Sequence, residues 1–254
     1  MCLLQLTGPL NWFCPLSYSL VHGSHIINGE KAPVNSMQYM VSVQSNGKHV
    51  CGGFLISEDF VVTAAHCNNP KPDLVVLGNH NIKSSNVKKI NIQYSCEFPT
   101  FQNVGLGNDI MLLKLSGKAS LNNKVKTIPL PTSSNDNLRD GQICSVAGWG
   151  KTGTSHHMVD DLRVVNVSIL NPQLCWEKWG GLPSNVICAG GYDTDKGFCQ
   201  GDSGGPLVCN GVAVGVVSFN RDLNCNYPDV PNVHTDISKY LPWINNVMKT
   251  KECV

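Results

Sequence analysis

The chain has 254 residues, enough for one large or two small β lobes with a core of their own. Its formal net charge is +1, from 19 basic and 18 acidic residues, which excludes a bulk electrostatic attraction to nucleic acid or to a membrane surface. Its 12 cysteines are spaced at least ten residues apart, so the short C-x-x-C pairs typical of metal sites do not occur. A disulfide framework, and with it an oxidising compartment, is therefore the favoured interpretation.

The N-terminal leader is uncharged. Residues 1–25 contain no Lys, Arg, Asp or Glu, as in the apolar part of a secretory signal peptide, although a basic n-region is absent. Val21 and Gly23 suit the −3 and −1 positions of a signal-peptidase site, which predicts a signal peptide over 1–23. The alternative is that the first part of the leader is a mis-assigned start. No later segment approaches the ~18–20 consecutive apolar residues of a membrane span.

From residue 26 onward the chain consists of short apolar runs separated by turn residues. Runs of this length and spacing predict an all-β protein with sandwich or barrel architecture. The Pro-containing stretch 127–134 separates two halves of similar size, and we expect the boundary between two lobes there. The predicted strands are 37–44, 51–56, 60–63, 74–77, 90–94, 110–115, 143–147, 162–170, 186–189, 206–209, 212–219 and 232–235.

Helical spacing is convincing only near the C-terminus. Asp236 is a typical N-cap residue, and the following apolar residues recur at helical spacing as far as Lys249. One C-terminal helix is therefore predicted, with an apolar face made by Ile237, Leu241, Ile244 and Val247.

Three short motifs combine residue types that nucleophilic catalysis uses. His66 ends an apolar strand in Thr-Ala-Ala-His-Cys, Asp109 begins one in Asn-Asp-Ile-Met-Leu-Leu, and Ser203 occupies a glycine-rich turn in Gly-Asp-Ser-Gly-Gly-Pro. Taken alone, each has a structural explanation: a core histidine, a cap at a strand start and a tight β-turn. Taken together they follow the chain order His, Asp, Ser, which separates the chymotrypsin arrangement from the subtilisin and α/β-hydrolase arrangements.

From Ile26 to its end the chain resembles the trypsin/chymotrypsin family of serine proteases. The matching stretches are IING, CGGFLI, TAAHC, NDIMLLKL, AGWG, CQGDSGGPL and VVSF. The resemblance implies two six-stranded antiparallel β-barrels with a C-terminal helix. It also implies a serine endopeptidase that works through an acyl-enzyme, with Ser203 as nucleophile, His66 as general base and Asp109 orienting the histidine.

The resemblance assigns further roles. The N–H groups of Gly201 and Ser203 would form the oxyanion hole, and Ser218 would lie beside Asp109. A new N-terminus at Ile26 would pair with Asp202. The implied disulfides are Cys51–Cys67, Cys144–Cys209, Cys175–Cys188 and Cys199–Cys225.

The leader is similar to that of granzymes and other leukocyte granule proteases. These are made with an activation dipeptide, which here would be 24–25, followed by a protease domain over 26–254. The residue before Ile26 is His25, so trypsin-like activation after Lys or Arg is not expected. We therefore expect a protein of the secretory granule lumen or the extracellular space. Asn166 begins an Asn-Val-Ser sequon on a predicted strand, which predicts a glycan there.

The positions that line the S1 pocket, which receives the side chain before the scissile bond, also follow from the resemblance. Gly197 stands where trypsin-like members have a carboxylate, so cleavage after Lys or Arg is not expected. Bulkier side chains than usual should narrow the pocket and favour small or medium uncharged residues. The S1 positions are Gly197, Phe198, Ser218, Phe219, Asn220 and Asn232.

No cofactor or metal is expected, because the stretch 79–89, which matches the calcium loop of the family, has no glutamate. The expected partners are protein or peptide substrates, not nucleic acid or a membrane. The remaining cysteines of the mature region, Cys96 and Cys253, would come within bridging distance if the C-terminal helix packs on the first lobe, which favours a monomer. The alternative is a disulfide-linked homodimer. A rival to the enzyme hypothesis is a catalytically impaired, protease-shaped binding or antimicrobial protein.

Overall fold

The computed structural model describes residues 26–133, 138–227 and 230–253. The predicted signal peptide 1–23 and dipeptide 24–25 lie outside the described residues. Within those ranges, no helix is both long enough and apolar enough to span a bilayer.

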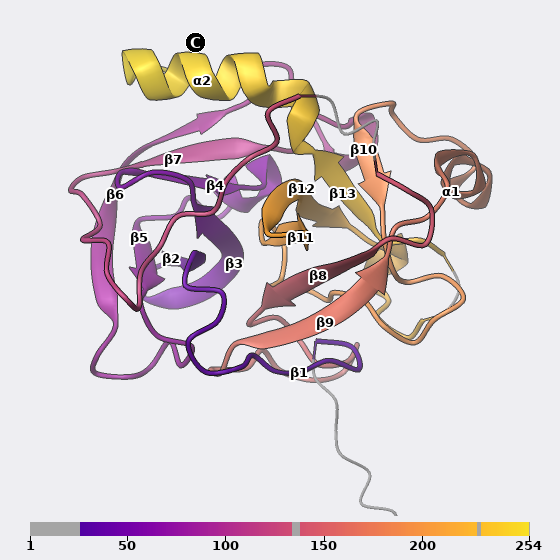
Figure 1. The fold of residues 1–254 in the computed structure, drawn as a ribbon, viewed down its shortest axis with the longest axis horizontal. Coiled ribbons are helices and arrows are strands. Elements are labelled where there is room, and N and C mark those ends of the chain that lie inside the picture. Colours follow the sequence, from indigo (N-terminus) through magenta and orange to yellow (C-terminus); the bar gives the residue numbers. More distant parts are fainter. Residues whose placement is uncertain (1–25, 134–137, 228–229, 254) are drawn as a thin grey trace, which may run out of the picture.

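The first half of the chain forms a closed antiparallel barrel with the strand order β2-β3-β4-β7-β6-β5 (Figure 1). Strand β2 is buried along its whole length. Val41 and Val43 belong to the core of the barrel, while Met40 packs with Trp149 and Leu162 of the second half. The barrel strands are β2 (Met40–Ser45), β3 (Lys48–Leu55), β4 (Phe60–Thr63), β5 (Leu74–Leu77), β6 (Lys88–Glu97) and β7 (Met111–Leu115), with 3-10 turns η1 (Ala65–Asn68) and η2 (Val104–Leu106).

The second half forms a seven-stranded sheet in the order β1-β9-β8-β11-β12-β13-β10, so the expected all-β fold with two lobes is confirmed and the second lobe has one strand more than the six expected. The additional strand is β1, which pairs with β9 because the N-terminal segment runs along the edge of this lobe. A bridge between Ile169, directly after β9, and Ala189, directly after β10, still brings these two strands of the sheet together. The strands are β1 (Glu30–Lys31), β8 (Ile143–Gly148), β9 (Arg163–Ser168), β10 (Val186–Cys188), β11 (Pro206–Cys209), β12 (Val212–Phe219) and β13 (Val233–Asp236).

A short helix, α1 (Pro172–Trp179), was not expected from the sequence. Its start and stop signals are nevertheless local: Asn171 accepts hydrogen bonds from the N–H groups of Gln173 and Leu174, Pro172 begins the helix, and Gly180 ends it with a left-handed conformation. Its apolar face is weak, since Cys175 is the buried residue of the helix. The disulfide to Cys188 in β10 fastens this helix to the sheet.

The chain returns to the first barrel at its C-terminus. Asp236 accepts a hydrogen bond from the N–H of Ser238 and caps the 3-10 turn η5 (Ile237–Tyr240), which leads into α2 (Leu241–Thr250). The expected helix over 236–249 thus begins as a 3-10 turn. Ile244 and Val247 join the core of the first barrel, and α2 lies along the side of that barrel at which β6 and β7 are found (Figure 1).

Among the described residues, five disulfides join ten cysteines, and four of the pairs are those that the family resemblance implies. The fifth joins Cys96 in β6 to Cys253, with 5.2 Å between the Cα atoms. The hydroxyl of Tyr94 donates to the carbonyl oxygen of Lys251 beside it. The end of the chain is therefore fastened to the first barrel.

Replacing both Cys96 and Cys253 by Ser should lower the free energy of unfolding by up to about 4–5 kcal/mol, because this bridge closes a loop with a sequence separation of 157 residues. Urea denaturation would measure the loss. On a non-reducing gel the unaltered protein should migrate as a monomer. A reducible dimer band that disappears with Cys96→Ser would contradict this pairing.

Candidate active site

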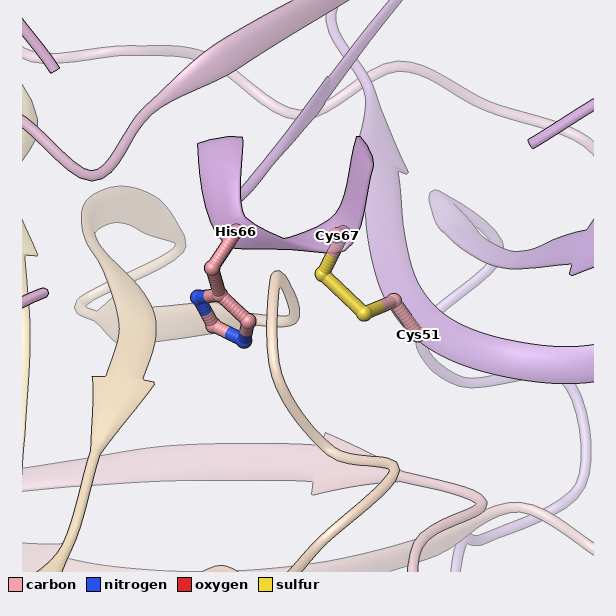
Figure 2. A group of neighbouring side chains, drawn as sticks. All are labelled: Cys51, His66 and Cys67. Atoms are coloured by element: carbon pink, nitrogen blue, oxygen red, sulfur yellow. A yellow bond between two sulfur atoms is a disulfide. The ribbon is translucent and has the colours of Figure 1, made fainter. Parts of the chain in front are cut away.

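His66 lies directly after β4, in η1, at the rim of the first barrel. Its neighbour Cys67 is bonded to Cys51 of β3, so the turn that carries the imidazole is fastened to the barrel wall (Figure 2). The main-chain N–H of His66 donates to Oδ1 of Asp109 at 2.9 Å, and its Nδ1 lies 2.7 Å from Oδ2. Because an ionised carboxylate only accepts, Nδ1 carries the proton and Nε2 presents a lone pair.

Asp109 is the buried member of this pair, with a side chain 1% exposed against 29% for His66. Burial alone would raise the pKa of the carboxyl, but hydrogen bonds from His66 and Ser218, together with the attraction of the imidazole, lower it below its ordinary value. Ser218 Oγ of β12 donates to Oδ2 at 2.5 Å, and Thr235 Oγ1 of β13 donates to the main-chain carbonyl. Both lobes therefore hold this residue in place.

Ser203 is half-buried in a loop that lies against the end of β4. Its carbonyl oxygen accepts a hydrogen bond from the N–H of Gly52 at 2.8 Å. The next residue, Gly204, has φ +81°, and a Cβ there would lie 2.1 Å from Oγ1 of Thr63. Only glycine permits this contact, which brings the serine loop against the segment that leads into His66.

Two backbone donors in this loop have no acceptor within the part of the chain that the structure describes. Gly201 has φ +97°, and a Cβ there would lie 2.9 Å from Cα of Gly150 and 3.1 Å from Sδ of Met158. Among the residues that the structure describes, neither the N–H of Gly201 nor that of Ser203 donates a hydrogen bond. Two free N–H groups beside a serine are what a tetrahedral oxyanion requires.

His49, which the sequence analysis did not single out, supports this loop. Its Nε2 lies 2.9 Å from the carbonyl oxygen of Gly201, and its Nδ1 lies 2.8 Å from Oγ of Ser42. Burial lowers the pKa of His49 to about 4, so its ring is neutral at pH 7 and donates to Gly201 through Nε2. The sequence around His49 does not indicate this role, because its partner Gly201 is distant in the sequence.

Asp202 is completely buried behind the serine loop. Its two carboxylate oxygens accept hydrogen bonds from the N–H groups of Gly150, at 2.8 Å, and Cys199, at 2.9 Å. Burial nevertheless raises the pKa of Asp202 to about 7, against the smaller effect of these bonds. Ile26 is also fully buried in the second lobe, and the N–H of Ile27 donates to the carbonyl of Gly197.

Comparison with known proteins agrees with this geometry. The Trypsin family model matches residues 26–244. Duodenase-1 of Bos taurus is 41% identical over 230 residues, covering 88% of this chain and 89% of the relative, and Granzyme B of Rattus norvegicus is 39% identical over 245 residues, covering 92% and 96%. Trypsin-3 of Salmo salar is 41% identical over 229 residues, covering 89% and 93%. The chain belongs to the trypsin family of serine proteases.

In this protease, four of the six expected S1 residues meet at one place. A Cβ at Gly197 would lie 2.3 Å from Oδ1 of Asn232, which itself accepts a hydrogen bond from the N–H of Phe198 at 3.3 Å. Asn220 is held nearby through its side-chain amide, which donates to the carbonyl of Asn224 at 3.0 Å. Hydrogen bonds therefore hold the backbone and side chains at these positions, and these groups do not form an open pocket.

The other two S1 residues face elsewhere. Ser218 is engaged with Asp109, as the resemblance implied. The ring of Phe219 packs edge-on against Trp179 of α1, with 5.1 Å between ring centroids. Phe198, one of the four that meet, contributes only its backbone there, because its ring is 3% exposed and packs edge-on against His234 in the interior of the second lobe.

The side chains of Cys51, His66 and Cys67 lie close enough together to suggest a metal site. They do not make one, because both sulfur atoms are used in the disulfide and a metal would need free thiolates (Figure 2). Nδ1 of His66 is also engaged with Asp109. The cluster is instead the anchor of the histidine.

Proposed function

We propose that this protein is an active endopeptidase in which Ser203, His66 and Asp109 form the catalytic triad. Oγ of Ser203 attacks the carbonyl carbon of the scissile peptide bond while Nε2 of His66 takes its proton. The imidazolium then gives that proton to the leaving amine. Water, deprotonated by His66, hydrolyses the acyl-enzyme and restores the serine.

The surrounding groups stabilise the charges that develop. Asp109 holds the tautomer of His66 and offsets the positive charge of the imidazolium. The free N–H groups of Gly201 and Ser203 would stabilise the oxyanion, and losing one such donor typically costs ~10²–10³ in turnover. His49 would act as a positioning residue, because its bond to the carbonyl of Gly201 orients the peptide group of that loop.

The proposal rests on one observation above all: a buried carboxylate holds Nδ1 of His66 at 2.7 Å and leaves Nε2 to accept a proton. Labelling by a fluorophosphonate probe tests it, since the probe needs a competent Ser203 but little fit in S1. The protein's own side chains at the S1 positions favour the rival function, that of an inactive protease-shaped binding protein. Absence of labelling in correctly processed protein would support that rival.

We also propose that cleavage before Ile26 activates the enzyme. A new ammonium group at Ile26 would pair with Asp202, whose buried carboxylate has only two backbone N–H groups as partners among the described residues. The pairing would favour the ionised form of Asp202 and order the loop of Gly201 and Ser203. The full burial of Ile26 supports its insertion into the second lobe.

This proposal predicts a difference in pH dependence between two forms of the protein. Where Ile26 is still preceded by Ser24 and His25, the folded pKa of Asp202, about 7, exceeds the unfolded value of about 3.9. The folded state then binds the extra proton, so the contribution of Asp202 to stability is greatest below about pH 4 and falls as pH rises to 7, by at most about 4 kcal/mol. Urea denaturation in a Ser203→Ala background, which prevents self-digestion, would show this.

The form that begins at Ile26 should lack this loss, since the ammonium stabilises the charged carboxylate. Asp202→Asn in the form that begins at Ser24 is the matched control and should abolish the loss as well. Equal pH dependence in the two forms would contradict the pairing.

We propose that the protease is exported, by a signal peptide over 1–23, to a secretory granule lumen or to the extracellular space, with 24–25 removed on activation. Five disulfides support an oxidising compartment. Relatives named Mast cell protease 3 of Ovis aries and Granzyme B of Rattus norvegicus support a leukocyte granule. Asn166 is exposed on β9, as a glycan at its sequon requires.

Its substrates would be proteins or peptides with an uncharged residue at P1, the residue before the scissile bond. Gly197 brings no carboxylate to the S1 floor to pair with Lys or Arg. Nearby, Asn220 and Asn232 add side-chain volume at the pocket wall. A monomer is the form we propose, since Cys253 is used within the chain.

A further inference from the structure

A tyrosine outside the expected S1 positions occupies the floor of the pocket. Gly197 forms that floor, and a Cβ built on it would lie 2.5 Å from Cε2 and 3.1 Å from Cδ2 of Tyr227. On the other side the same Cβ would meet Oδ1 of Asn232 at 2.3 Å. The space into which a side chain at 197 would project is therefore already filled by an aromatic ring and a carboxamide.

The hydroxyl of Tyr227 joins two residues that line the pocket. It donates to the carbonyl oxygen of Phe198 at 2.7 Å and accepts from Nδ2 of Asn220 at 3.0 Å. Phe198 follows Gly197 on the floor, and Asn220 follows β12 on the wall. The hydroxyl thus bridges the backbone of Phe198 and the side chain of Asn220, and these two hydrogen bonds fix the hydroxyl end of the ring.

The ring is also supported from behind. Tyr227 packs against Ile27 and the disulfide of Cys199 and Cys225, whose Cα atoms lie 5.6 Å apart. Ile27 in turn pairs with Gly197 through two backbone hydrogen bonds, of 3.0 and 3.4 Å. A long P1 side chain would have to displace a ring that is held by this disulfide and by the N-terminal segment.

Displacement would also break polar contacts. The carbonyl of Phe198 and the amide of Asn220 would each lose the tyrosine hydroxyl, although Asn220 would keep its bond to the carbonyl of Asn224, and an apolar P1 side chain offers neither a donor nor an acceptor in return. Cleavage after a large apolar residue therefore carries a cost that cleavage after a small residue avoids, because a small side chain ends above the ring.

We propose that Tyr227 closes the floor of the S1 pocket and is the main specificity-determining residue of this protease, restricting P1 to Gly, Ala or Ser. This inference rests on the proposed protease activity. It assigns the P1 specificity chiefly to Tyr227, which follows Cys225 in the chain, and not to the residue type at position 197 alone.

The test compares the mature protein with Tyr227→Ala on peptides that differ only at P1, as Ala, Val, Leu, Phe and Arg. We expect kcat/KM for P1 Leu or Phe, relative to P1 Ala, to rise about 10²-fold in the variant, the scale on which apolar pockets discriminate side-chain size. Leu223→Ala is the matched control. Its side chain lies in the same loop, is 67% exposed and should leave the ratio unchanged.

Labelling with a fluorophosphonate separates the two proposals. If the unaltered protein is not labelled, the proposed activity fails. If the unaltered protein and Tyr227→Ala are both labelled and the P1 ratio does not change, the role of Tyr227 is refuted. Should Tyr227→Ala not be labelled, Tyr227→Phe takes its place. It keeps the ring but loses both hydroxyl bonds, and a smaller shift, about 10-fold toward Val and Leu, is expected. Loss of labelling in both variants would show a structural role instead.

Gly197→Asp gives an independent readout. Alone it should add no measurable cleavage after Arg, because its Cβ would collide with Tyr227 and Asn232. Combined with Tyr227→Ala, the new carboxylate would face open space, and cleavage after Arg should become detectable. Efficient cleavage after Arg by the single variant would overturn the inference.

Discussion

Replacing Ser203 by Ala should reduce peptide hydrolysis by about 10⁶-fold while the protein still folds and is still processed. The oxygen removed is the one that forms the acyl-enzyme, and water bound in its place would lack the activation that His66 gives to a serine in this position. Because Ser203 is only half-buried and its backbone contacts remain, stability should change little.

The measurement is kcat/KM on a small-P1 peptide substrate, together with the urea midpoint. Ser116→Ala, an exposed serine of the first lobe, is the control for a serine-to-alanine change elsewhere and should retain full activity. Substantial hydrolysis by the Ser203 variant, after exclusion of contaminating protease, would rule out the triad mechanism.

Replacing Asp109 by Asn should reduce kcat by about 10⁴-fold. A carboxylate can only accept the Nδ1–H of His66, whereas a carboxamide can turn its NH₂ group toward the ring and stabilise the other tautomer. Nε2 would then carry the proton and could not take one from Ser203. The main-chain N–H of His66 would keep an acceptor in the amide oxygen, so the loop should stay in place.

Ser218→Ala is the matched control for this second prediction. It removes the 2.5 Å hydrogen bond to Oδ2 of Asp109 but leaves the carboxylate and the tautomer of His66 unchanged. We expect it to cost far less, about 10-fold. Steady-state kinetics with saturating substrate measure both variants, and Asp109→Asn activity above a tenth of the unaltered enzyme would contradict the role given to the carboxylate.

The sequence by itself determined the fold class, the family and the residues in local motifs. His66, Asp109 and Ser203 were recognisable because each lies within a short segment whose neighbours explain it: a cysteine that anchors the turn, an apolar strand and the glycines that shape the loop. The C-terminal helix was predictable for the same reason, since its apolar residues follow a helical period. Helix α1 carried similar signals, in Asn171 and Pro172, but its apolar face is too weak for periodicity to show it.

Only the tertiary structure decided which distant residues complete the site. His49 meets Gly201 across 152 positions of sequence, and Tyr227 meets Phe198 across 29. Neither residue has a local pattern that marks it, because its partner is brought to it by the packing of the two lobes against each other in the one case and by the Cys199–Cys225 disulfide in the other. The sequence showed that Gly197 leaves the S1 floor without a charge. Whether that floor is filled depends on the path of the loop that carries Tyr227. This path is set by contacts with residues distant in the sequence, which no local pattern encodes.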